Sequence, residues 1–233
     1  MNERALTPIV ADRIWASERP VWFSGVRLRA RATVIRLDDG GLLLHSPAPP
    51  TDALAAELRA LGPVRWLVVP NIFHHLGTPA ATARFPEATV VGPASARSHN
   101  RALRIDLDLR DPRFAAQVPE VEALPLEGVP FLDETVLFHR PTQTLLGTDL
   151  VLCADASDHW TWRGAARLMG CYQTLRVPPD VRPKLVDRTA AARSIHAMLQ
   201  RPAHRLIVAH AGVVEAGCRE ALAEAWRREG ISV

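Results

Sequence analysis

The stretch VRWLVVPNIFHHLG, residues 64–77, joins an apolar run to two adjacent histidines. The apolar run ends at Pro70, and His74 and His75 follow within one short loop. A short continuous apolar run is consistent with a buried strand. In α/β sheets, functional side chains collect beyond the carboxyl ends of the strands. The stretch therefore predicts a buried strand that delivers imidazole groups to one edge of a sheet.

Three other segments repeat this pattern. Residues 42–44 (LLL) lead into His45, residues 144–148 (TLLGT) into Asp149, and residues 205–209 (RLIVA) into His210. Imidazole and carboxylate groups are the nitrogen and oxygen ligands that zinc and similar divalent metals accept. Because all of these side chains follow predicted strand ends, we interpret their recurrence as a metal site built from distant segments.

Each of these residues also has a simpler interpretation. His45 precedes Ser-Pro, and a hydrogen bond to its own turn is favoured over a ligand role. The pair His74 and His75 belongs to a solvated loop in the simpler view. Asp149 serves as a turn or cap residue, and His210 as a buried, hydrogen-bonded histidine. Each simpler interpretation is acceptable for its own residue. Together, however, they do not explain why histidine or aspartate follows four separate apolar runs.

Periodicity and turn residues predict the remaining elements. Hairpins are expected within residues 26–44 and 134–149, the latter turning at residues 140–143. Helices are expected at residues 51–61, from Thr78, near 162–168, at 188–200 and at 215–229. Strands are expected at residues 64–69, 89–91 and 205–209, whereas 94–118 gives no clear pattern. Early strands followed by mixed strands and helices predict one α/β domain spanning residues 1–233.

Composition excludes several classes of protein. The chain has 233 residues, of which 48% are hydrophobic, and a formal charge of +3. This favours a folded core and, without a basic stripe, does not favour nucleic-acid binding. We also expect no membrane segment, no secretory leader and therefore a cytoplasmic protein. Cys153, Cys171 and Cys218 are widely spaced, so reduced thiols are expected.

The order of these motifs resembles the metallo-β-lactamase superfamily, from about Arg29 to the C-terminal helix. The matching segments are the early hairpin, residues 71–77, residues 145–150 and residues 209–212. The resemblance implies a four-layer αββα sandwich with a metal site at one edge of its two sheets. Members are mostly metal-dependent hydrolases, with some oxidoreductases and nucleic-acid processing enzymes.

The sequence departs from the superfamily's main motif, His-x-His-x-Asp-His-x-Gly. Aligned on His75-Leu-Gly77, the aspartate position holds His74, and the two earlier histidine positions hold Pro70 and Ile72. The middle histidine, expected near residues 128–131, is also missing. The resemblance therefore implies a divergent branch that keeps only the second metal subsite.

The sequence thus predicts a single-metal hydrolase acting on an ester, amide or phosphoester of a small-molecule substrate. The expected metal is zinc, with iron or manganese as alternatives, and the expected ligands are His74, His75, Asp149 and His210. Asp149 is also the candidate catalytic residue, which orients the attacking water as a base. His45 lies where the superfamily often has an aspartate beside the site.

Two further hypotheses remain open. Trp160, Trp162 and arginines of residues 155–183 frame a pocket for an anionic or flat substrate, or they only pack and carry solvated charge. The alternative function is a non-catalytic protein of the same fold, acting as a small-molecule sensor or interaction module. A closed site, with every metal position filled by protein, would favour the non-catalytic alternative.

Overall fold

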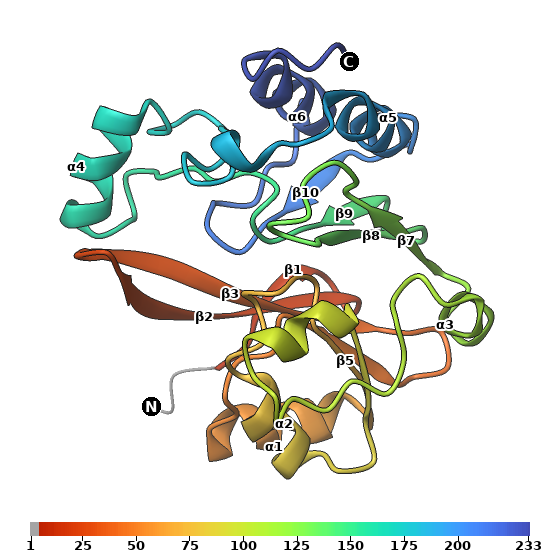
Figure 1. The fold of residues 1–233 in the computed structure, drawn as a ribbon. Coiled ribbons are helices and arrows are strands. Elements are labelled where there is room, and N and C mark those ends of the chain that lie inside the picture. Colours follow the sequence, from red (N-terminus) through yellow and green to blue (C-terminus); the bar gives the residue numbers. More distant parts are fainter. Residues whose placement is uncertain (1–4) are drawn as a thin grey trace. The chain divides into compact units, whose positions relative to one another are not determined.

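The computed structural model describes residues 5–233 and forms two compact units. Unit 1 comprises the chain up to Glu18 together with Arg31–Glu120, and unit 2 comprises Arg19–Ala30 and Val121–Val233. Each unit is described by itself below, with elements labelled as in Figure 1. The single domain spanning residues 1–233 stays a prediction.

Unit 1 is built on a six-stranded sheet with the order β1-β2-β3-β4-β5-β6. The strands are β1 (Thr7–Val10), β2 (Ile14–Phe23), β3 (Val26–Arg36), β4 (Leu42–His45), β5 (Val64–Val68) and β6 (Thr89–Val91). The tip of the β2–β3 hairpin, Arg19–Ala30, belongs to unit 2. The strands β4, β5 and β6 run parallel, with His45 opposite Val68 and Val68 opposite Val91. Their carboxyl ends therefore meet at one edge of the sheet.

Within the described residues, unit 1 also contains four helices. They are α1 (Asp52–Leu61), α2 (Thr78–Arg84), the 3-10 helix η1 (Ala94–Ser98) and α3 (Pro112–Gln117). The hydroxyl of Thr51 accepts the N–H of Leu54 at 3.2 Å and caps α1. Leu54 and Leu58 of α1 pack with strand residues such as Leu67 in one buried cluster. Apolar residues at helical spacing thus fix how α1 covers the sheet.

Unit 2 is built on a four-stranded sheet with the order β10-β9-β8-β7. The strands are β7 (Val121–Pro125), β8 (Thr135–His139), β9 (Thr144–Leu146) and β10 (Arg205–Ile207). The helices are α4 (Trp160–Met169), the 3-10 helix η2 (Arg182–Lys184), α5 (Arg188–Leu199) and α6 (Cys218–Arg227). Helix α5 contacts β7 and α6, and α6 contacts β10 (Figure 1).

Strands β9 and β10 run parallel, with Leu145 opposite Leu206 and Leu146 opposite Ile207. The N–H of Gly147 continues the ladder by donating to the carbonyl of Ile207 at 2.9 Å. Because parallel strands end at the same sheet edge, the residues that follow them, including Asp149 and His210, emerge together.

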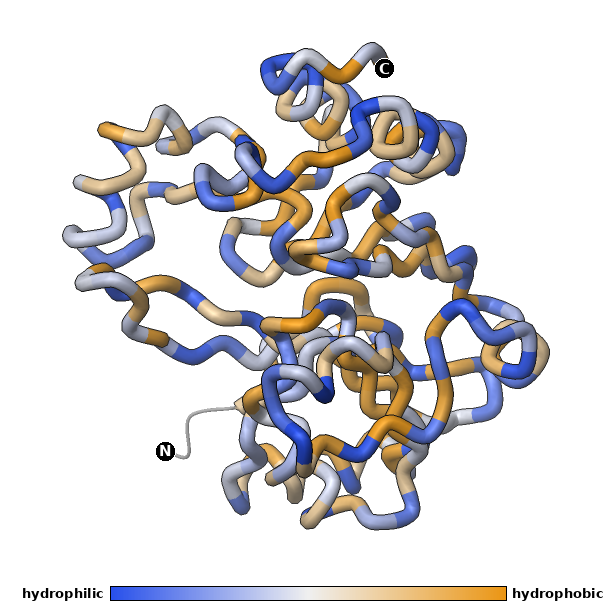
Figure 2. The backbone as a smooth tube through the Cα atoms, in the orientation of Figure 1, coloured by the Kyte–Doolittle hydropathy of each residue, from blue (hydrophilic) through white to orange (hydrophobic). Residues whose placement is uncertain are grey.

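The predicted hairpins and helices are confirmed. Figure 2 shows hydrophobic stretches (orange) alternating with hydrophilic ones (blue) along the backbone. Strands β1, β2 and β7 were not predicted, and residues 94–118 contain η1 and α3. None of the helices in residues 5–233 is both long enough and apolar enough to cross a membrane.

Two side chains of unit 2 are buried inside the fold. His139, the last residue of β8, is fully buried, because β8 lies between β7 and β9 in the sheet. Its Nδ1 lies 2.7 Å from the hydroxyl of Thr142. Trp162 packs in a small buried cluster with Ala154, Ala166 and Cys171, so for this residue the packing alternative holds. Trp160, by contrast, is exposed.

Candidate metal centre

Asp149 and His210 meet at the edge of the sheet of unit 2. The carboxylate Oδ1 of Asp149 lies 3.6 Å from Nε2 of His210. Both side chains are mostly buried, with exposed fractions of 18% and 15%. The predicted convergence of these two residues, which are 61 positions apart in the sequence, is therefore confirmed.

The position of Asp149 is set by a buried carboxylate that the sequence analysis did not single out. Oε1 of Glu134 accepts the N–H of Thr148 at 2.6 Å and its hydroxyl at 3.0 Å. Oε2 of Glu134 accepts the N–H of Asp149 at 3.0 Å. A buried carboxylate is stable only when hydrogen-bond donors surround it. Here the donors belong to the turn that carries Asp149.

The ring of His210 is oriented by the backbone of the hairpin. Nδ1 of His210 lies 2.6 Å from the carbonyl oxygen of Arg29. Because a carbonyl oxygen only accepts hydrogen bonds, Nδ1 carries a proton, and in the neutral form of the ring Nε2 presents its lone pair. Histidines that bind metals commonly donate their second ring N–H in this way. The atom that faces Asp149 is thus the one suited to a metal.

Unit 1 presents the adjacent histidines on a loop shaped by Asn71. The side-chain oxygen of Asn71 accepts the N–H groups of Phe73 and His74, each at 2.8 Å, and so folds the chain into a tight turn. Nδ1 of His74 lies 2.7 Å from the hydroxyl of Ser46. Ser46 itself is held beside β5 by its N–H, which donates to the carbonyl of Val68 at 2.9 Å.

Ser46 adopts a left-handed backbone conformation, with φ of 53°. A residue other than glycine pays a conformational cost there, and such residues cluster at functional sites. Here the conformation accompanies the contact between the Ser46 hydroxyl and the ring of His74.

His75 has a different environment from His74. Its Nδ1 lies 2.9 Å from the carbonyl oxygen of Ile72, so in the neutral ring Nε2 presents the lone pair, as in His210. The ring is buried, and its centroid lies 6.5 Å from that of the exposed His99. The two histidines that align with superfamily ligands, His75 and His210, therefore share one tautomer.

His45 is buried beside this loop. Its Nε2 is buried and has no hydrogen-bond partner within residues 5–233. Burial, with a smaller effect from the nearby His74, lowers the pKa of His45 to about 3. The ring is therefore neutral at ordinary pH, and its buried Nε2 keeps an unused lone pair within the described residues.

These donors fit a divalent metal. Zinc holds nitrogen and oxygen ligands at about 2.0–2.2 Å, so two ligands at a tetrahedral angle lie roughly 3.3–3.5 Å apart. The separation of 3.6 Å between Asp149 and His210 is close to that value. The two superfamily positions filled by Pro70 and Ile72 are buried and offer no ligand atom. The donor set is therefore reduced relative to the superfamily motif.

Cysteine chemistry does not contribute to this centre. Cys153, Cys171 and Cys218 are free thiols. Burial raises the pKa of all three thiols, that of Cys171 to about 11. Because the thiolate is the reactive form, these cysteines are poor nucleophiles and poor metal ligands.

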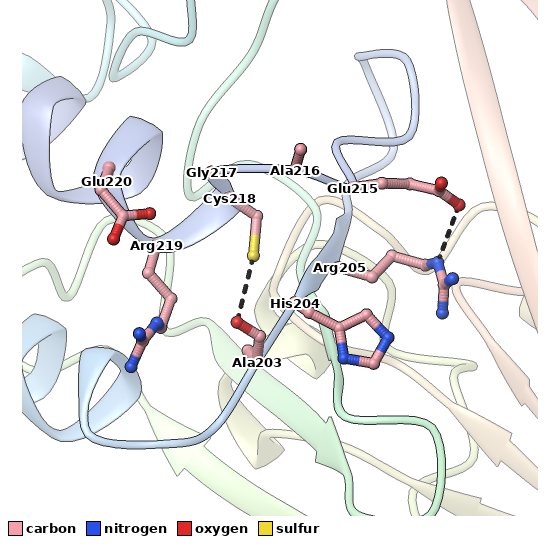
Figure 3. A pocket seen from close by; sticks show the side chains of 9 residues that line it. All are labelled: Ala203, His204, Arg205, Glu215, Ala216, Gly217, Cys218, Arg219 and Glu220. Atoms are coloured by element: carbon pink, nitrogen blue, oxygen red, sulfur yellow. Dashed lines mark hydrogen bonds and ion pairs between the residues drawn. The ribbon is translucent and has the colours of Figure 1, made fainter.

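A cavity of about 400 Å³ lies elsewhere in unit 2, between β10 and the start of α6 (Figure 3). Nε of Arg205 lies 3.2 Å from Glu215 at its wall, and the thiol of Cys218 donates to the carbonyl of Ala203 at 3.5 Å. Its lining residues include none of the predicted ligands. This cavity is therefore not the predicted metal site.

The comparison with protein families matches part of the chain. A family described as Domain of unknown function (DUF4336) matches residues 11–103. No curated protein matches the sequence.

Solved structures match over almost the whole chain. A metallo-β-lactamase from Erythrobacter litoralis aligns with a TM-score of 0.70 at 12% identity, covering 97% of this chain and 95% of that one. The FIM-1 metallo-β-lactamase from Pseudomonas aeruginosa, in a mono-zinc form, gives 0.67 at 13%, covering 97% of each chain. A metallo-β-lactamase from Pontibacter korlensis gives 0.65 at 14%, covering 97% and 99%.

The chain therefore has the metallo-β-lactamase fold, with two sheets and six α-helices within residues 5–233. The fold that the motifs implied by resemblance is therefore confirmed. The αββα layering stays a prediction.

Proposed function

We propose that this protein is a metal-dependent hydrolase that uses one divalent metal to activate water against an ester, amide or phosphoester. The metallo-β-lactamase fold and the donors of the candidate centre support this function. Zinc is the first candidate, with iron or manganese as alternatives, because the donors are imidazole and carboxylate groups.

The observation that carries the proposal is the pair formed by Asp149 and His210. Oδ1 of Asp149 lies 3.6 Å from Nε2 of His210. The backbone N–H of Asp149 donates to the carboxylate of Glu134, and Nδ1 of His210 donates to the carbonyl of Arg29. Such support is typical of metal ligands, whose orientation depends on the groups that contact them. The proposed ligand set is completed by His74 and His75, the histidines that follow β5.

A metal held by these residues would lower the pKa of a bound water to about 7 and would polarise the substrate oxygen. The protein's own part is to orient the reactants. In this proposal the carboxylate of Asp149 accepts a proton from the attacking water. The neutral ring of His45 contributes no charge of its own near the histidine loop, because its pKa is about 3.

The test is to measure bound metal in the full-length protein and in His210→Ala and Asp149→Asn variants. We expect the affinity for zinc, measured by competition with a chelator, to fall at least about tenfold in each variant, because a ligand is lost. His204→Ala is the matched control, since His204 is exposed and lies at the separate cavity. Wild-type affinity in both ligand variants would disprove the proposed ligand set.

Hydrolysis is tested separately with a panel of esters, phosphodiesters and β-lactams, with and without added zinc. We expect turnover that depends on the metal and is lost in His210→Ala. If zinc binds at these residues but no member of the panel is hydrolysed, the non-catalytic alternative replaces the hydrolase.

A further inference from the structure

The guanidinium group of Arg29, on β3, binds one loop of unit 2, residues 155–158. Nη2 of Arg29 lies 3.1 Å from Asp155, 2.8 Å from the hydroxyl of Ser157 and 3.1 Å from Asp158. Nε adds a bond of 3.3 Å to Asp158. Asp158 is almost completely buried, and Arg29 is 16% exposed. This is a partly buried ion-pair network, which constrains geometry more strongly than an isolated surface pair.

The backbone of the same residue contacts the proposed ligand. The carbonyl of Arg29 accepts Nδ1–H of His210 at 2.6 Å, although the residues are 181 positions apart. The backbone carbonyl of His210 accepts the N–H of Cys153 at 3.2 Å, and Cys153 lies just before the loop that Arg29 holds. The contacts therefore close a ring that runs from Arg29 through residues 153–158 to His210 and back.

We propose that Arg29 is a positioning residue for His210. Its side chain holds residues 155–158 against β3, and its carbonyl then meets the His210 ring at one fixed orientation. This keeps the proton on Nδ1 and the lone pair of Nε2 directed at Asp149. The consequence for metal affinity rests on the proposed function, whereas the consequence for the His210 tautomer does not.

The tip of the β2–β3 hairpin is attached to the rest of unit 2 by contacts that do not involve the Arg29 side chain. Val26 and Leu28 of β3 pack against a buried cluster that includes Ala154 and Trp162. The N–H of Arg27 also donates to the hydroxyl of Thr161 at 3.1 Å. Because these contacts persist when the guanidinium is removed, Arg29→Met is expected to fold, and its effect reports on His210.

The experiment compares Arg29→Met with Arg27→Met in the full chain. Arg27 is exposed, lies two residues away on the same strand and has no ion pair within residues 5–233. The His210 tautomer is read in the metal-free protein, at a pH high enough for the ring to be neutral, from the ¹⁵N shifts of the ring, assigned with the His210→Ala spectrum. We expect Nδ1–H alone in wild type and Arg27→Met, and mixed tautomers in Arg29→Met. Zinc affinity is expected to fall about 10–100-fold only in Arg29→Met.

Asp158→Asn provides a second variant, which removes one charge from the network at nearly constant size. It is expected to change the His210 tautomer in the same direction as Arg29→Met, and it serves alone if Arg29→Met does not fold. A wild-type tautomer in the folded variants would overturn the proposal. If wild type binds no zinc, the proposed function fails, yet the tautomer measurement still decides the role of Arg29.

Discussion

The N–H of Asp149 donates to the carboxylate of Glu134 at 3.0 Å, so one acidic residue fixes the backbone that presents the other. Glu134 is 1% exposed and also accepts both donors of Thr148. Gly147 lies against the same group, because a Cβ there would stand 3.2 Å from Oε1 of Glu134. Three donors from one turn thus converge on a single buried carboxylate.

Glu134→Gln should loosen this turn. A glutamine keeps only one acceptor oxygen, so its NH₂ group would face a backbone or hydroxyl donor. We expect a loss of about 1–3 kcal/mol in the free energy of unfolding, and a fall of about 10–100-fold in zinc affinity. Urea denaturation and chelator competition measure the two effects. Glu127→Gln is the control, since Glu127 is exposed. Unchanged zinc affinity in Glu134→Gln would show that the turn does not position a ligand.

Ser46 offers a test that separates backbone strain from the contact with His74. Ser46→Ala and Ser46→Gly both remove the hydroxyl that lies 2.7 Å from His74, but only glycine relaxes the left-handed backbone. We expect equal losses of zinc affinity in both variants. Ser46→Gly should be more stable than Ser46→Ala by about 1 kcal/mol. If the alanine variant binds zinc as wild type does, Ser46 has no role in orienting His74.

Gly77, which ends the histidine loop, should tolerate no side chain. A Cβ at this position would stand 2.8 Å from the carbonyl carbon of Ala48 and closer still to the carbonyl oxygen of Pro47. We expect Gly77→Ala to cost at least about 2 kcal/mol in the free energy of unfolding. Gly164→Ala is the matched control, because its Cβ meets nothing within 4 Å in α4. That variant should gain about 0.5–1 kcal/mol. Equal melting temperatures would contradict the packing argument.

Cys171 should make stability depend on alkaline pH. Its pKa rises from 9.0 to about 11 on folding, mainly through burial. Between these values the unfolded chain has lost the proton that the folded chain keeps, so stability falls as pH rises. The contribution is at most about 1.4 kcal/mol per pH unit. Urea titrations at pH 9 and 10.5 should show a shallower loss in Cys171→Ala. Burial also raises the pKa of the Cys153 and Cys218 thiols, but both remain in the variant, so the difference between the two slopes reports Cys171. Identical slopes of stability against pH in the wild type and in Cys171→Ala would rule out this contribution of Cys171.

The placement of the histidines and of Asp149 was predictable because apolar runs mark buried strands, and the polar residues that follow a run lie just beyond the end of its strand. This reasoning located residues 64–77, Asp149 and His210, and the structure confirms the meeting of Asp149 with His210. It did not find β1 or β2, in which the hydrophobic pattern is irregular, as in IWASERPVWF.

Sequence by itself determined which side chains stand at the ends of the strands, since local periodicity and turn chemistry encode that information. Only the tertiary structure assigned roles to Glu134, Ser46 and Arg29. Their partners are Asp149, His74 and His210, which lie 15, 28 and 181 positions away. Such bonds depend on strand register and on the path of the connecting loops, and neither leaves a repeating pattern along the chain. The groups that orient the candidate ligands are therefore set by folding, whereas the ligands themselves are visible in the sequence.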